Sequence, residues 1–302
     1  MNSKKRVSLI SQLNVFRLVY RSVLFLAGVI VYLIYRFTAN EFFNFLNPES
    51  VLAIISLSVM TLLLGIEMFE RLFPVNTSSM GSQKQFKKNF RPSNIKKPVL
   101  QPAKGTLIVV ISWVALNAVF GILYFLHIID GGVLVLIFLF YSVSDMICIL
   151  FFCPFQTWMM HNRCCSMCRI YNWDFVMMTT PLFVLLIPYS FNIADASWTL
   201  HHWFEHANPY FITLIILSLI IYIIWEVTYR THPERFSDAT NLSLRCGFCQ
   251  ERLCAHKKQL QVLLRDSTKL IRGFYSAEER DIQAHKTKEE LAKEEQAKND
   301  QQ

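Results

Sequence analysis

Six of the eight cysteines fall in two short groups, and each group contains a C-x-x-C spacing. The first group runs from His161 to Cys168, and the second runs from Cys246 to His256. A C-x-x-C turn lets two thiolates reach one metal ion, and Gly247 suits such a turn because it has no Cβ. We expect a metal centre formed by these residues: Cys164, Cys165, Cys168, Cys246, Cys249, Cys254 and His256.

The spacing of these thiols leaves the identity of the metal open. Four thiolates suit a zinc ion and an iron–sulfur cluster equally well. The second group alone would complete a Cys₃His zinc site, so one shared site and two separate sites both remain possible. Two interpretations without a metal also remain. In the first, the cysteines are simply reduced thiols in the cytosol, and in the second, the vicinal Cys164 and Cys165 carry out thiol–disulfide exchange.

A second cluster of possible ligands is the run His202-x-x-Glu205-His206. It matches the H-x-x-E-H pattern, in which two histidines bind zinc and the glutamate acts as a base. The alternative is an interfacial helix whose Trp and His side chains lie among the lipid headgroups, and we favour this interpretation because no third ligand is evident.

Asp145 lies in an otherwise apolar stretch of the chain, Val133–Cys153. A charged carboxylate inside a bilayer costs several kcal/mol, so Asp145 must have a partner, face a cavity or stay protonated. Asn117, in the preceding apolar stretch, is a natural hydrogen-bond partner. Asp145 is therefore either part of a proton or cation relay or one half of a polar clamp between helices.

The elements that position these residues are predicted to be membrane helices. The chain of 302 residues is 53% hydrophobic, and its 17% of charged residues is well below the roughly 25% of soluble domains. Six apolar segments of about 20 residues are each long enough to cross about 30 Å of hydrocarbon. These segments are Phe16–Tyr35, Val51–Phe69, Thr106–His127, Val133–Cys153, Phe175–Ile193 and Pro209–Val227. Arg17 and Arg21 in the first segment are expected to snorkel to the interface.

The distribution of Lys and Arg predicts the orientation. They concentrate in the N-terminus, in the second and fourth connections and in the tail, whereas the other three connections carry mainly Asp and Glu. By the positive-inside rule both termini and both cysteine groups are then cytoplasmic. We expect an all-α integral protein of a bacterial plasma membrane, with a Cys-rich cytosolic face and a charged tail.

The expected organisation has four parts. They are a basic cytosolic N-terminus (1–15), a six-helix membrane domain (16–227) with a basic loop (70–105) and a Cys-rich loop (154–174), a Cys-containing cytosolic segment (228–275), and a charged helical or disordered tail (276–302). The 70–105 loop is expected to be mobile and to lie near anionic lipid headgroups. The pI near 9.1 is attributed to such loops, so we expect no nucleic-acid partner.

Two functions fit these features. In the first, the cytosolic cysteine centre carries electrons to or from a membrane or cytosolic redox partner, or senses metal or redox state. In the second, the protein is a permease that uses Asp145, and the cysteines form a structural metal clasp. A third and weaker hypothesis is that the protein is a thiol–disulfide oxidoreductase. No phosphate-binding loop, dinucleotide-binding turn or nucleophile elbow is present, and the sequence does not decide whether the protein is an enzyme.

Overall fold

The computed structural model describes residues 9–38, 41–44, 46, 50–74, 81–95, 97–100, 103–151, 153–160, 168–186 and 208–245. All of them belong to the first of two compact units, Met1–Cys254, and the second unit is Ala255–Gln302. In the described residues the regular structure is helical, apart from one isolated bridge between Pro92 and Asn241.

Five described helices are long and apolar enough to cross a membrane. They are α1 (Leu9–Thr38), α2 (Val51–Glu70), α4 (Ala103–Phe125), α5 (Gly131–Leu150) and α8 (Pro209–Thr231). Each overlaps one of the predicted apolar segments. This confirms, for the described residues, an all-helical fold that is compatible with a membrane protein.

The helix α6 (Asp174–Leu185) is shorter, with 12 residues and Pro181 inside it. At 1.5 Å per residue it is about 18 Å long, which is less than the thickness of the hydrocarbon core. It covers the first part of the predicted fifth segment, Phe175–Ile193, and residues 187–193 of that segment lie outside the described residues. The described helices therefore establish five candidate spans and one shorter helix.

Local sequence explains where several helices begin. Ser50 and Asp130 each accept a hydrogen bond from the backbone N–H three residues later, at the starts of α2 and α5. Asn208 plays the same role for α8, and Pro209 occupies the first position of that helix. Proline is favoured there because its missing N–H would have no partner in the helix.

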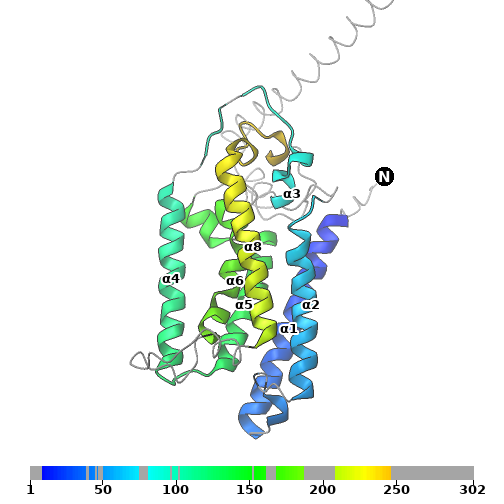
Figure 1. The fold of residues 1–302 in the computed structure, drawn as a ribbon, viewed down its shortest axis with the longest axis vertical. Coiled ribbons are helices and arrows are strands. Elements are labelled where there is room, and N and C mark those ends of the chain that lie inside the picture. The colour runs from blue at the N-terminus through cyan, green and yellow to red at the C-terminus, as the bar shows by residue number, and fades with distance from the viewer. Residues whose placement is uncertain are drawn as a thin grey trace, which may run out of the picture. The chain divides into compact units, whose positions relative to one another are not determined.

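The helices pack side by side, with α4 at one side and with α1 and α2 at the other (Figure 1). α5 packs mainly against α1 and α6, and α8 packs mainly against α2 and α6. α4 contacts α6 and the π-helical turn η3 (Phe155–Met159). The main core lies where α2, α5, α6 and α8 meet and includes Leu64, Phe138, Leu182 and Leu214.

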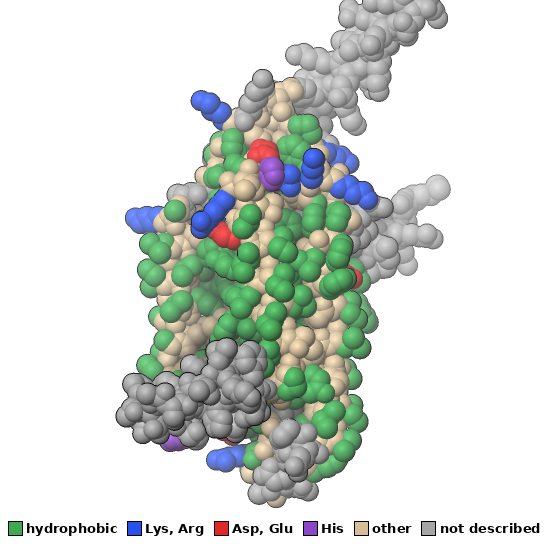
Figure 2. Space-filling view, in the orientation of Figure 1, with side chains coloured by type: hydrophobic (Ala, Val, Ile, Leu, Met, Phe, Trp, Pro, Cys, Tyr) green, Lys and Arg blue, Asp and Glu red, His purple; other side chains and the backbone are tan. Residues whose placement is uncertain are grey.

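The surface agrees with a membrane location. Figure 2 shows hydrophobic side chains over the middle of the visible face, with most Lys and Arg side chains towards the end that carries α3. The outer faces of α1 and α4 expose many large apolar side chains, such as Phe16, Ile30, Ile111 and Val119. Such surface suits contact with lipid rather than with water.

One end of the bundle carries several short elements, and we call it the α3 end. They are α3 (Gly81–Gln85), η2 (Lys87–Asn89), η5 (Arg169–Asn172), η6 (Pro233–Arg235) and η7 (Leu242–Leu244). A further short helix, η1 (Glu41–Phe43), joins α1 to α2.

Much of the predicted 70–105 loop is held in place at the α3 end. Asn241 donates to the carbonyl oxygens of Lys84 and Arg235, and Leu242 donates its backbone N–H to Arg91. Lys84 is 1% exposed. Residues 81–95 therefore form short helices and hydrogen bonds with the segment that follows α8. The mobility of the loop and its contact with headgroups stay predictions.

Candidate functional site

A cavity of about 480 Å³ lies between α4, α5 and α6 on the side towards the α3 end. Most of its lining side chains are apolar or aromatic, and they include Trp113 of α4, Tyr141 of α5 and Phe155 of η3. The Trp113 ring lies 4.6 Å from the Tyr141 ring and 5.8 Å from the Phe155 ring, measured between centroids. The volume falls within the range of small-molecule sites, roughly 300–1,000 Å³.

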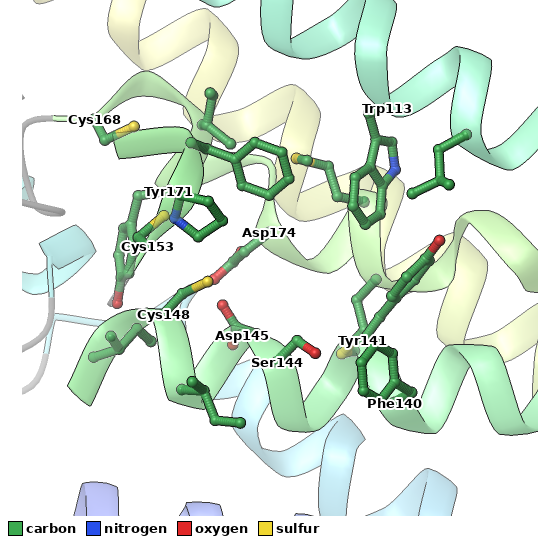
Figure 3. A pocket seen from close by; sticks show the side chains of 18 residues that line it. Trp113, Phe140, Tyr141, Ser144, Asp145, Cys148, Cys153, Cys168, Tyr171 and Asp174 are labelled. Atoms are coloured by element: carbon green, nitrogen blue, oxygen red, sulfur yellow. The ribbon is translucent and has the colours of Figure 1, made fainter. Parts of the chain in front are cut away.

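Two carboxylates, three thiols and one serine hydroxyl lie among the apolar and aromatic lining residues. The residues are Asp145, Asp174, Cys148, Cys153, Cys168 and Ser144. Figure 3 shows Asp145, Asp174 and Cys148 close together at one part of the cavity, with Trp113, Tyr141 and Phe140 grouped at another. The cavity thus has an aromatic part and a polar part.

Asp145 is held by an arginine from α1. Its Oδ2 accepts a hydrogen bond of 3.0 Å from Nη1 of Arg21, and the same nitrogen donates to the carbonyl oxygen of Ser142 at 2.7 Å. Arg21 is 2% exposed and also forms an ion pair with Glu67 of α2. Asp145 itself remains 16% exposed, on the side that lines the cavity.

Arg17 extends the same network by one helical turn. It pairs with Glu67 and with Glu70, and the hydroxyl of Tyr20 also donates to Glu67. Arg17 and Arg21 are 4% and 2% exposed, so the expectation that they snorkel to the interface is wrong. Their charges are instead balanced within the protein by Glu67 and Asp145, since an unpaired charge there would be costly.

Asp174 is held by a second arginine, Arg71, which directly follows α2. The guanidinium of Arg71 pairs with Oδ2 of Asp174, and it lies over the rings of Tyr171 and Phe175 at 4.5 and 4.9 Å. Burial raises the pKa of the Asp174 carboxyl to about 7, and the positive charge of Arg71 opposes that rise without cancelling it.

The two carboxylates influence each other electrostatically. The negative charge of Asp145 contributes to the raised pKa of Asp174 and also favours the charged form of Arg71. Neither Arg21 nor Arg71 is among the residues that line the cavity. A molecule in the cavity would therefore meet carboxylate oxygens, with the guanidinium groups behind them.

The thiols in the cavity come from three segments. Cys148 belongs to α5, Cys153 follows that helix, and Cys168 directly precedes η5. All three are present as thiols, and the Sγ of Cys168 lies 3.4 Å from the Sδ of Met160. Within the described part of the chain, no three His, Cys, Asp or Glu side chains are arranged to hold a metal ion.

Most of the predicted metal ligands lie outside the described residues. This applies to Cys164, Cys165, Cys246, Cys249, Cys254 and His256 of the main centre, and to His202, Glu205 and His206 of the second cluster. Cys168 is the one member of the predicted centre that is described, and it is 5% exposed.

Asn117 does not occupy the predicted place beside Asp145. Its side-chain nitrogen donates to the carbonyl oxygen of Trp113 on the same helix, and its Oδ1 lies 3.5 Å from the hydroxyl of Tyr141. Asp145 has Arg21 as its partner instead, because α5 packs closely against α1. The clamp between helices therefore exists, but with α1 rather than with α4.

Sequence reasoning missed Arg21, Glu67, Arg71 and Asp174 as members of the site. The available signal was that Arg17, Arg21 and Glu67 interrupt apolar stretches, where charged residues need partners. The spacing of Arg17 and Arg21 by four residues also places them on one face of a helix.

A third ion-pair group lies at the α3 end of α8. Glu226 accepts hydrogen bonds from Arg169 and Arg230, and the indole N–H of Trp173 also reaches it at 3.4 Å. This group fixes η5 to α8, and so it fixes the segment that supplies Cys168 and Tyr171 to the cavity.

Comparison with protein-family models, with curated proteins and with solved structures finds no match, so the geometry of the cavity itself carries the functional interpretation.

Proposed function

We propose that the protein is a membrane permease for small amphipathic organic cations, and that the cavity between α4, α5 and α6 is the binding site. One observation carries the proposal: the cavity combines aromatic walls with the carboxylates of Asp145 and Asp174 inside a bundle of membrane-compatible helices. Ionisable groups at such positions usually belong to substrate or ion pathways.

The sign of the charge favours a cation. Asp145 uses Oδ2 to bind Arg21, and Oδ1 has no hydrogen-bond donor among the described residues. A ligand ammonium or another cationic group can therefore approach Oδ1 from the cavity. In an apolar cavity this attraction is stronger than in water, because the local dielectric constant is lower.

The aromatic part of the cavity supports the same ligand class. Trp113, Tyr141 and Phe155 form a connected group of rings beside the carboxylates. Ring faces attract cations and bury apolar groups, and the contact contributes about 0.5–2 kcal/mol according to its exposure. A ligand with both an apolar body and a positive charge would use both parts of the cavity.

Protonation of Asp174 supplies a coupling mechanism. Because the pKa of this carboxyl is raised to about 7, a proton and a cation compete for the polar part of the cavity near neutral pH. Binding of the cation would favour the ionised form, and the proton would leave. A proton gradient can then drive release of the cation on the more acidic side.

Binding to the purified protein tests the ligand class. Tetraphenylphosphonium and tetraphenylborate have nearly the same size and opposite charge, so their affinities separate charge recognition from apolar partitioning. We expect the cation to bind at least tenfold more tightly, and Asp174→Asn to reduce this preference about tenfold. Ser144→Ala is the matched control, because Ser144 lines the same cavity without a charge. Equal affinities for the two probes would exclude cation recognition.

Transport is tested separately in proteoliposomes. Uptake of labelled tetraphenylphosphonium should depend on a pH gradient and should be lost in Asp145→Asn. That variant should still fold, since the amide oxygen can accept the hydrogen bond from Arg21. Binding without uptake would contradict a permease and leave a binding protein.

A metal centre in the cysteine groups is the second candidate, and one observation favours it. η5, which follows Cys168, and η7, which ends just before Cys246, both contact α3. The described residues that adjoin the two C-x-x-C groups, Cys168 and Arg245, therefore lie at the same end of the bundle. A zinc ion or an iron–sulfur cluster held there would serve electron transfer or sensing, with a membrane or cytosolic redox partner.

The cysteine variants distinguish a shared centre from separate sites. Cys168→Ser and Cys246→Ser should each remove the same metal, and the double variant should lose little more. Two separate sites would give half-loss from each change, and unchanged metal content in all three would leave the cysteines as free thiols.

We also propose six membrane spans, with both termini in the cytoplasm and the α3 end facing it, in a bacterial plasma membrane. The Lys and Arg side chains at that end support this orientation (Figure 2), and they also suit contact with anionic headgroups. Labelling of Cys246 in intact cells by an impermeant thiol reagent would contradict it.

A further inference from the structure

A second, smaller cavity of about 70 Å³ lies at the α3 end and shares no lining residue with the main cavity. It is formed where four elements meet: the end of α2, the end of α3, the last turns of α8, and η6. Its volume exceeds the roughly 10–15 Å³ that a single water molecule needs. The lining residues that matter here are Arg71, Trp225, Thr228 and Arg235.

Trp225 gives the first indication of a ligand. The residue is 2% exposed, and its indole packs against the rings of Phe86 and Phe236 at 4.9 and 6.3 Å. Its Nε1–H is buried without an acceptor in the described residues. An indole nitrogen can only donate a hydrogen bond, so this group needs an acceptor inside the cavity. The cavity lining also contains Gln85, whose buried amide oxygen is an acceptor but is not bonded to the indole.

The charges around the cavity are positive. Arg235 is half-buried and has no carboxylate partner among the described residues. Arg71 is paired with Asp174, and the nearby Glu234 and Glu226 are engaged by His232 and by Arg169 and Arg230. The cavity thus combines an unsatisfied donor with an uncompensated guanidinium.

We propose that this cavity binds a phosphate group, with Arg235 and the indole N–H of Trp225 as its principal donors. A guanidinium matches phosphate geometry with two parallel hydrogen bonds, and the indole supplies a third. Trp225 and Thr228 lie in the last two turns of a membrane-compatible helix. The phosphate can therefore come from an anionic lipid headgroup at the membrane edge or from inorganic phosphate in solution.

The first experiment uses the full-length protein in nanodiscs made only of phosphatidylcholine. Potassium phosphate is titrated against potassium chloride at equal ionic strength, while thermal unfolding and tryptophan fluorescence are recorded. We expect a saturable rise in Tm with phosphate and a fluorescence change that disappears in Trp225→Phe. Arg235→Gln should weaken the apparent affinity at least tenfold.

Arg230→Gln is the matched control. Arg230 lies on the same end of α8 but is 74% exposed and pairs with Glu226 outside the cavity. Its variant should bind phosphate as the parent protein does. The Tm of each variant without phosphate shows whether it has folded, so a folding defect is separated from loss of the site.

A second nanodisc composition identifies the source of the phosphate. If a lipid headgroup occupies the cavity, phosphatidylglycerol in the nanodisc should raise the Tm of the parent protein but not of Arg235→Gln, and added phosphate should then have no further effect. If the ligand is inorganic phosphate, its effect should be the same in both compositions. No saturable effect of either phosphate source, or equal effects in Arg235→Gln and Arg230→Gln, would overturn the proposal and leave water as the acceptor for Trp225.

Discussion

The two faces of α5 differ in how closely they pack against the neighbouring helices. On the α1 side, Arg21 is buried and its charge is balanced by Asp145 and Glu67, while Gly28 lets the two helices approach closely. On the α4 side, the rings of Trp113 and Tyr141 meet beside a cavity, and Gly121 of α4 has Val184 of α6, rather than a residue of α5, as its nearest neighbour. One face is packed tightly and the other leaves space.

Asp145 belongs to both faces. Its Oδ2 binds Arg21 on the α1 side, and its side chain also lines the cavity on the α4 side. A residue in this position can pass a change in the cavity to the ion-pair network. Arg21 and Glu67 therefore hold the bundle together, whereas Trp113 and Tyr141 lie where they can contact a ligand.

Removing the charge of Arg21 should have the largest effect. In Arg21→Met, Asp145 loses its arginine partner and Glu67 keeps Arg17 as its described ion-pair partner and Tyr20 as a hydrogen-bond donor, so we expect a loss of about 3–5 kcal/mol in the free energy of unfolding. The matched change Arg36→Met, at an exposed position of the same helix, should cost less than about 0.5 kcal/mol. Unfolding by SDS in mixed micelles measures both, and equal stabilities would contradict a structural role for the network.

Two glycine substitutions test the difference in packing directly. A Cβ at Gly28 would lie 3.0 Å from Leu139 and 3.3 Å from Leu136, so Gly28→Ala should destabilise the protein by about 1–3 kcal/mol. At Gly121 the nearest atom would be 3.9 Å away, so Gly121→Ala should be neutral or stabilising by up to about 1 kcal/mol. The same unfolding assay applies, and the reverse order would show that the α4 side is the tighter one.

The pH dependence of cation binding should follow Asp174. Its pKa of about 7 means that it is mostly protonated at pH 6 and mostly ionised at pH 8. A cation favours the ionised form, so the affinity for tetraphenylphosphonium should rise about tenfold over this interval and then level off. Equilibrium binding at several pH values measures this. In Asp174→Asn the dependence should disappear, and a parent protein with pH-independent binding would refute the coupling.

A substitution in the aromatic wall of the cavity should have the smallest effect, and the effect should be on ligand affinity. Trp113→Leu keeps an apolar side chain but removes the ring face, so we expect the affinity for tetraphenylphosphonium to fall about fivefold, or about 1 kcal/mol. Trp158→Leu is the control, because Trp158 is 67% exposed and lies outside the cavity. Equal losses in the two variants would mean that Trp113 does not contact the ligand.

The sequence alone determined where the long apolar helices lie and, for two of them, the residue at which they begin. The predicted Val51–Phe69 and Pro209–Val227 correspond to α2 and α8, with the same first residues and later ends. This agreement has a local cause: helix formation depends on neighbouring residues, on caps such as Ser50 and on Pro209 at the first position.

The partner of Asp145 and the cavity could be identified only from the tertiary structure. Arg21 and Asp145 are 124 residues apart, and the sequence offered Asn117 as a nearer partner. Which charged groups meet depends on which helices are neighbours and on their rotation about their axes, and residue spacing along one helix does not contain that information. The same applies to the cavity, since it exists because α4 contacts α6 and η3 without filling the space beside α5.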